Sequence, residues 1–158
     1  DPDEVRRRGA EPVDLDTLLA QSDVVSLHCP RDASTLRLMD ERRFAQMKRG
    51  AIFITTSRGG IHDEQALIQA LQSGHLSAAG VDVWDREPPP LDHPLLALDQ
   101  VYATFHTAGV THEARRNVGR MGAEQLIEWK HELQMPPRCA NPQAWSAHLA
   151  RRHKVLGF

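Results

Sequence analysis

Short apolar runs recur along the chain and restrict its possible folds more than any other feature. Four of them predict strands, at residues 24–28 (VVSLH), 51–55 (AIFIT), 78–83 (AAGVDV) and 101–105 (VYATF). Runs that are apolar throughout, rather than alternating with polar residues, are typical of strands in a parallel sheet covered on both faces. The sequence therefore predicts an α/β fold.

Helix signals separate these runs. Asp40 can cap a helix that ends at Gly50, and Asp63 can cap another that ends at Gly74. A longer helix is predicted from residue 111 to about residue 133. Because right-handed crossovers join parallel strands, the carboxyl ends of all four strands should meet at one edge, where ligands bind in such sheets.

Composition excludes several function classes. The chain has 158 residues, and 19 basic against 21 acidic residues give a net charge of −2. That balance offers no general attraction for nucleic acid or for an anionic membrane. No apolar stretch is long enough to span a bilayer, and no signal-peptide pattern opens the chain. Cys29 and Cys139 lack metal or redox spacing, which favours free thiols in the cytoplasm.

Residues able to do acid–base and anion chemistry lie at the ends of the predicted strands. They are His28 at the end of the first, Arg58 after the second, Asp82 in the third, Glu87 just after it, and His106 directly after the fourth. A carboxylate beside an imidazole stabilises its cationic form, which suits it to general acid–base catalysis. A guanidinium can hold a substrate carboxylate through two parallel hydrogen bonds.

Other interpretations exist for the same residues. Taken singly, each is more often a surface or structural residue than a catalytic one. A metal-dependent hydrolase using His93, His106 and His112 is disfavoured, because the last two lie six positions apart rather than three or four on a helix face.

Four segments, at the spacing found here, resemble successive motifs of the D-isomer-specific 2-hydroxyacid dehydrogenases, to which phosphoglycerate dehydrogenase belongs. They are LDTLLAQSDVVSLHCP, MKRGAIFITTSRGGIHDEQALIQAL, AAGVDVWDREPP and DHPLLALDQVYATFHTAGVT, and the likeness runs from about residue 14 to residue 142. The resemblance implies an NAD-dependent interconversion of a small 2-hydroxy acid and a 2-keto acid, with NADP not excluded. It does not indicate which acid is the substrate.

The resemblance also implies roles for individual residues. Arg58 would hold the substrate carboxylate, His106 would be the general acid–base, and Glu87 would orient His106. Six further positions match residues that line the nicotinamide side of the cofactor cleft: His28, Pro30, Thr35, Ser57, Asp82 and Gly109. No residue matches a metal ligand.

Two positions depart from the family pattern. Phe105 stands where the family usually has a proline before the catalytic histidine, and the loss of that fixed φ could re-aim the imidazole. Thr55 stands where the family has an asparagine, which is a milder change.

The ten glycines do not form the G-x-G-x-x-G turn that a dinucleotide fold uses to bind pyrophosphate. The expected fold is therefore part of a Rossmann-type doubly wound parallel sheet that lacks the glycine-rich first βαβ. Residues 1–133 would form a partial NAD-binding domain, and residues 134–158 a tail that returns to a missing substrate domain. The alternative is a non-catalytic truncated paralogue or a corepressor-like binding module.

This expected truncation has a physical consequence. The strand at residues 24–28 would lose a neighbour and become an open apolar edge, which invites pairing with another chain. The chain is therefore expected to be a homo-oligomer, such as a dimer, that associates through this strand.

Overall fold

The computed structural model describes residues 1–132, 135 and 139–156. The chain forms two compact units, Asp1–Ala108 and Gly109–Phe158. The boundary expected between a partial NAD-binding domain and a C-terminal tail falls at residues 133–134, outside the described residues, and it stays a prediction.

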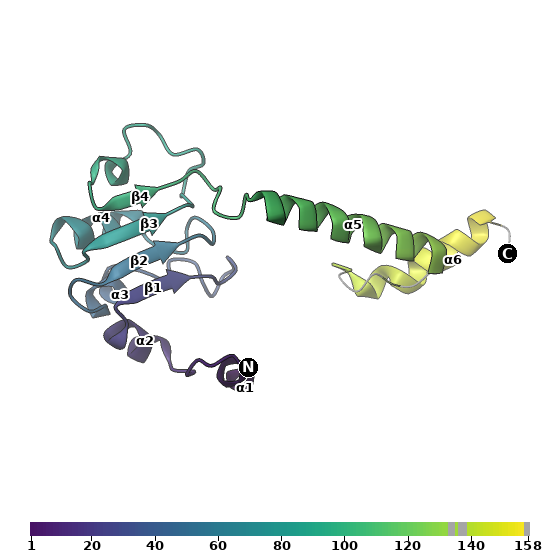
Figure 1. Ribbon diagram of the computed structural model, residues 1–158, viewed down its shortest axis with the longest axis horizontal. Coiled ribbons are helices and arrows are strands. Elements are labelled where there is room, and N and C mark those ends of the chain that lie inside the picture. Colours follow the sequence, from purple (N-terminus) through teal and green to yellow (C-terminus); the bar gives the residue numbers. More distant parts are fainter. Residues whose placement is uncertain (133–134, 136–138, 157–158) are drawn as a thin grey trace. The chain divides into compact units, whose positions relative to one another are not determined.

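The first unit is built on one parallel sheet whose four strands lie in sequence order (Figure 1). The strands are β1 (Val24–Leu27), β2 (Ile52–Thr55), β3 (Ala78–Val81) and β4 (Val101–Ala103). All three pairings are parallel. The predicted α/β class is thus confirmed. Each strand is one or two residues shorter than expected, so that His28 and Asp82, which were placed within strands, lie in loops.

A short helix, α1 (Pro2–Arg7), opens the chain, and three further helices lie around the strands of the first unit. Each of the three begins at an aspartate whose carboxylate accepts a backbone N–H of the first turn, as helix starts require. They are α2 (Leu15–Gln21) at Asp14, α3 (Glu41–Gln46) at Asp40 and α4 (Glu64–Gln72) at Asp63.

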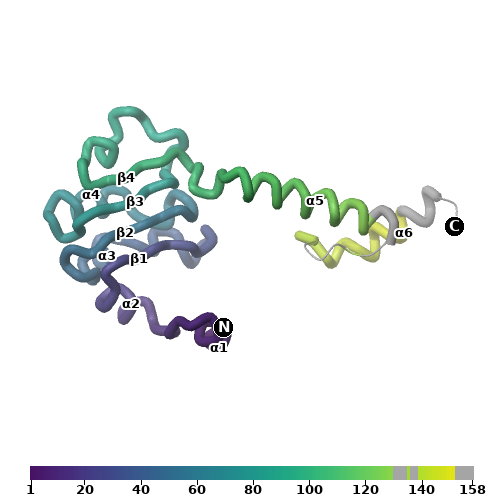
Figure 2. The backbone as a smooth tube through the Cα atoms, viewed as in Figure 1, coloured from purple at the N-terminus to yellow at the C-terminus, as the bar shows by residue number. Residues whose placement is uncertain are grey.

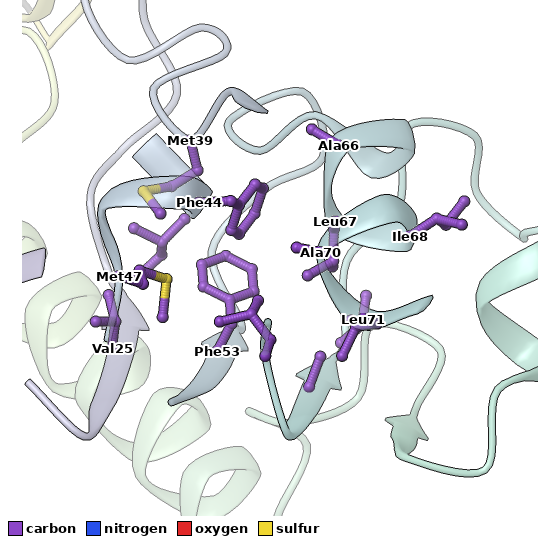
Figure 3. Close-up of a cluster of buried hydrophobic side chains, with 14 of the residues drawn as sticks. Val25, Met39, Phe44, Met47, Phe53, Ala66, Leu67, Ile68, Ala70 and Leu71 are labelled. Carbon is purple, nitrogen blue, oxygen red and sulfur yellow. The ribbon is translucent and has the colours of Figure 1, made fainter. Parts of the chain in front are cut away.

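The core lies on one face of the sheet, between the strands and the helices. Phe44 of α3 and Leu67 of α4 face Phe53 of β2, and the rings of Phe44 and Phe53 meet edge to face at 5.0 Å (Figure 3). On the opposite face, Val24 is 50% exposed and Tyr102 is 78% exposed.

The expectation of two helix-covered faces is therefore not met within residues 1–108. The strand order explains why. The chain moves across the sheet in a single direction (Figure 2), and right-handed crossovers made in one direction place their helices on the same face.

The second unit is helical. It consists of α5 (His112–Glu132), the 3₁₀ turn η2 (Pro142–Ala144) and α6 (Trp145–Leu156). Its two long helices contact each other through aromatic rings, since the ring of Trp129 in α5 lies 5.6 Å from that of His148 in α6 between centroids. Within α6, the ring of His148 stacks on that of Trp145 at 5.2 Å. The helix expected from residue 111 is confirmed as far as Glu132. None of the helices among the described residues has the length and apolarity needed to cross a membrane.

His62 is one of the polar side chains buried in the first unit, together with Thr55 and Asp82. His62 is 1% exposed, its ring centroid lies 5.8 Å from that of Phe53, and neither ring nitrogen has a hydrogen-bond partner. Burial lowers the pKa of His62 below its usual value of 6.5, because the cationic form is poorly solvated there.

This burial predicts a pH dependence of stability. Below pH 6.5 the unfolded chain protonates His62 before the folded chain does, so the contribution of His62 is complete above pH 6.5 and is lost as pH falls towards the lower pKa of the folded state. In that window the free energy of unfolding should fall by up to about 1.4 kcal/mol per pH unit.

Urea titrations between pH 7.5 and 5 measure this dependence. The variant His62→Leu should remove it, whereas His112→Gln, at an exposed position, should retain it. A pH dependence that is the same in His62→Leu as in the original chain would contradict the assignment.

Candidate active site

The loops that follow the four strands meet at the carboxyl edge of the sheet, as parallel pairing requires. Arg58 comes from the loop after β2, Glu87 from the loop after β3, and His106 from the loop after β4. These are the residues that the sequence pattern assigned to catalysis.

His106 and Glu87 form a hydrogen-bonded pair. The Nδ1 of His106 donates to Oε2 of Glu87 over 2.8 Å, and Oε1 of Glu87 accepts the backbone N–H of Trp84 over 3.2 Å. The hydrogen bond from His106 lowers the pKa of Glu87, which favours the carboxylate form. Because Nδ1 is committed to the carboxylate, Nε2 is the ring atom left to exchange a proton with a ligand.

Arg58 lies close enough for its charge to act on this pair. It is among the groups that lower the pKa of Glu87, after the hydrogen bonds that Glu87 makes. Its guanidinium is exposed, and Nη1 donates to the carbonyl oxygen of Ser57 over 2.6 Å. The structure thus brings together a cation, a carboxylate and an imidazole from three separate loops.

Asp82 holds the loop that carries His106. Its carboxylate accepts the hydroxyl of Thr104 and the backbone N–H groups of Thr107 (2.8 Å) and Ala108 (3.1 Å), while its carbonyl oxygen accepts the N–H of His106 (2.7 Å). Asp82 is 3% exposed. Burial alone would raise the pKa of Asp82, but these hydrogen bonds outweigh it and lower the pKa, so the group stays ionised.

The contacts of Asp82 also account for the effect of Phe105. His106 has a φ of 55°, in the left-handed region, and Phe105 is exposed. Hydrogen bonds from both sides of His106 to Asp82 fix this backbone without a proline. The imidazole therefore still reaches Glu87, and the re-aiming considered from the sequence is not observed.

Gly59 allows the loops after β2 and β3 to touch backbone to backbone. A Cβ at this position would lie 1.9 Å from the carbonyl oxygen of Trp84. The next residue, Gly60, donates its N–H to Oδ1 of Asp85 over 2.7 Å. Arg58 is therefore held at a fixed place relative to the turn that begins at Trp84 and leads to Glu87.

A second set of contacts, made by Glu64 and His93, also holds the turn that begins at Trp84. Glu64, at the start of α4, accepts the backbone N–H of Asp85 (2.8 Å) through one oxygen and pairs with Nε2 of His93 (3.1 Å) through the other. The ring of His93 also meets that of Trp84 edge to face at 5.2 Å. The sequence pattern did not assign supporting roles to Gly59, Glu64 or Trp84, because their spacing carries no signal and only the fold brings them together. His93 appeared in it only as a candidate ligand of the disfavoured metal site.

The remaining predicted residues divide into three groups. His28, Pro30 and Ser57 line a cavity of about 650 Å³ together with Arg58. Thr35 does not line it but closes the loop after β1, since its hydroxyl donates to the carbonyl oxygen of Pro30 over 2.7 Å. Gly109 belongs to the second unit.

One residue that lines the cavity, Ser57, has a polar atom without a hydrogen-bond partner. The hydroxyl of Ser57 is buried and has no hydrogen-bond partner. A polar ligand such as the nicotinamide part of a dinucleotide would satisfy it, so the residues present fit that group. Within the described part of the chain, no three His, Cys, Asp or Glu side chains are placed to hold a metal ion.

Comparison with known proteins identifies the family. Residues 1–108 match the sequence profile of the D-isomer specific 2-hydroxyacid dehydrogenase, NAD binding domain. The chain belongs to this family. The match confirms the resemblance drawn from the motifs, and the cofactor of the matched domain is NAD.

Relatives of known activity support the assignment. The chain is 47% identical over 119 residues to a D-3-phosphoglycerate dehydrogenase of Archaeoglobus fulgidus, covering 75% of this chain and 23% of the relative. It is 44% identical over 142 residues to a glyoxylate/hydroxypyruvate reductase B of Escherichia fergusonii, covering 90% of this chain and 44% of the relative.

Solved structures of the family agree. A glyoxylate reductase from Paecilomyes thermophila superimposes with a TM-score of 0.76 at 33% identity, covering 85% of this chain and 40% of the other. One family structure, from Xanthobacter autotrophicus, contains NADPH. The chain spans 23%, 44% and 40% of the length of the phosphoglycerate dehydrogenase, the reductase B and the Paecilomyes reductase, and 53% of the Xanthobacter chain.

The close approach at Gly59 gives a testable prediction. Gly59→Ala should destabilise the chain by about 1–3 kcal/mol or more, because the new methyl group meets backbone atoms that cannot rotate away. Urea denaturation measures this. Gly119→Ala, in α5 with no atom within 4 Å of the added carbon, should be neutral or stabilising by up to about 1 kcal/mol. Equal effects of the two substitutions would count against the packing described.

Proposed function

We propose that this chain acts in an NAD-dependent oxidoreductase that interconverts a 2-hydroxy acid and a 2-keto acid. The observation that carries the proposal is the His106–Glu87 hydrogen bond beside Arg58 at the carboxyl edge of the sheet. These three groups supply what the reaction needs from a protein: an anion-binding site, a proton-exchanging atom, and a carboxylate that orients it.

Each residue has a stated part in the reaction. Arg58 binds the carboxylate of the acid, and His106 removes the hydroxyl proton at Nε2 as the carbonyl forms. Glu87 keeps Nδ1 protonated and stabilises the imidazolium that results. NAD, when bound, would supply the acceptor for the hydride that leaves the hydroxyl-bearing carbon. In the reverse direction His106 returns the proton to the carbonyl oxygen.

The residues lining the cavity would hold the nicotinamide side of the cofactor. His28 and Pro30 come from the loop after β1, and Ser57 from the loop after β2. The resemblance also gives Gly109 a place on the nicotinamide side, and we include it in the proposal on that ground. Both cysteines are free, which favours a reducing compartment, the cytoplasm.

The proposal is tested by NADH titration and turnover of the 158-residue chain with glyoxylate or hydroxypyruvate. We expect saturable NADH binding and NADH oxidation. His106→Gln should lower kcat by about 10²- to 10⁴-fold with NADH affinity unchanged. Arg58→Gln should raise KM for the keto acid by about 10- to 100-fold, because one charge-assisted hydrogen-bonding partner is lost.

The matched controls are Arg42→Gln, at an exposed position on α3, and His112→Gln. Both should leave kcat and KM unchanged. Absence of both NADH binding and turnover would contradict the proposal. Saturable NADH binding without turnover would favour the non-catalytic, corepressor-like alternative.

We further propose that copies of the chain associate through β1. This strand is at the edge of the sheet, it pairs only with β2 among the described residues, and Val24 beside that edge is half exposed. An uncovered apolar edge strand favours pairing with a second copy.

Light scattering over a range of concentrations tests this. The chain should show a concentration-dependent dimer, and Val24→Lys should weaken it, because a charge at the edge disfavours strand addition. Tyr102→Lys, on the opposite edge strand, is the control and should not weaken it. A monomer at all concentrations would refute the association.

A further inference from the structure

Two guanidinium groups line the cavity at the edge of the sheet. The segment His28–Arg31 forms one wall and the segment Thr56–Arg58 forms the other. No acidic residue is among those that line it. The proposed reaction uses only Arg58, so the charge of Arg31 has no part in it.

Within the part of the chain that the structure describes, neither guanidinium group has a carboxylate partner. Neither Arg31 nor Arg58 has an ion pair within 4.0 Å among residues 1–132, 135 and 139–156, whereas Arg37 in the same loop as Arg31 pairs with Asp63. Asp32, the nearest acid in sequence, accepts instead from the backbone N–H and the hydroxyl of Ser34. With two cationic side chains and no acidic residue in its lining, the cavity favours an anion.

The position of Arg31 is defined by Gly60. A Cβ at Gly60 would lie 3.4 Å from both Nε and Nη2 of Arg31, so the guanidinium lies against the backbone two residues beyond Arg58. The N–H of Gly60 is already donated to Asp85, which ties this backbone to the loop after β3. Arg31 thus packs on the same turn that carries Arg58, although 27 positions separate the two in the sequence.

We propose that Arg31 is a second anion-binding residue of this cavity, which binds a carboxylate or phosphate group in addition to the carboxylate bound by Arg58. A ligand with one negative charge would neutralise only one of the two guanidinium groups. The group bound by Arg31 can be the far end of a dianionic substrate or a phosphate of the cofactor. The substrate case rests on the proposed function and defines its substrate class as acids with a second anionic group.

Binding can be measured without turnover, by NMR titration of the ¹⁵N-labelled 158-residue chain. The first pair of probes is D-malate and D-lactate, which differ by one carboxylate. The second pair is nicotinamide mononucleotide and nicotinamide riboside, which differ by one phosphate. A charge-assisted hydrogen bond at a partly exposed site should make the member with the additional anionic group bind about five- to tenfold more tightly in the relevant pair.

Arg31→Gln should abolish that preference, and Arg42→Gln should retain it. If the variant loses the preference for D-malate, the anionic group bound by Arg31 belongs to the substrate. If it loses the preference for the mononucleotide, that group is a phosphate of the cofactor. Either result supports the proposal. It is overturned if Arg31→Gln changes neither preference, or if the original chain shows no saturable shift with D-malate or the mononucleotide.

The binding measurements and the turnover assay of the proposed function can fail separately. A chain that binds a dianion through Arg31 but never oxidises NADH would refute the dehydrogenase activity and leave the anion site intact. The chain could instead oxidise NADH while the Arg31→Gln variant keeps both preferences, for D-malate over D-lactate and for the mononucleotide over the riboside. That result would refute only the role of Arg31.

Discussion

Parallel pairing of the four strands in sequence order places every connection under the same constraint. The right-handed crossovers all step across the sheet in the same direction, so the helices lie on one face. Because the strands are parallel, the loops that follow them lie at one edge. The core of Phe44, Phe53 and Leu67 and the group of Arg58, Glu87 and His106 are two results of this arrangement. The exposed side of the sheet, with Val24 and Tyr102, is a third.

Within that frame, Asp82 and Gly59 connect the loops to one another. The carboxylate of Asp82 accepts hydrogen bonds from residues on both sides of His106. Asp82 therefore supports the loop rather than offering its carboxylate to a ligand. Gly59 removes the side chain that would keep the loop after β2 away from Trp84. Through these two contacts the loops after β2, β3 and β4 hold Arg58, Glu87 and His106 in one arrangement.

Charge is distributed unequally around this edge. Arg37 pairs with Asp63, and His106 pairs with Glu87. Arg31 and Arg58 line one cavity, and neither forms an ion pair with a carboxylate of residues 1–132, 135 or 139–156. In a chain whose net charge is −2, that leaves a local excess of positive charge among the residues that line this cavity. The pocket is therefore suited to anions by placement and not by overall composition.

The sequence by itself determined the α/β class, the order of the strands and helices, and the residues delivered to the carboxyl edge, because apolar runs and helix caps are local signals. It did not determine the single covered face, which depends on the direction of the crossovers. Nor did it determine what Asp82, Gly59 and Arg31 contact. Asp82 bonds residues 22 to 26 positions away, and the neighbours of Gly59 and Arg31 are as distant in the chain, so only the tertiary structure brings them together.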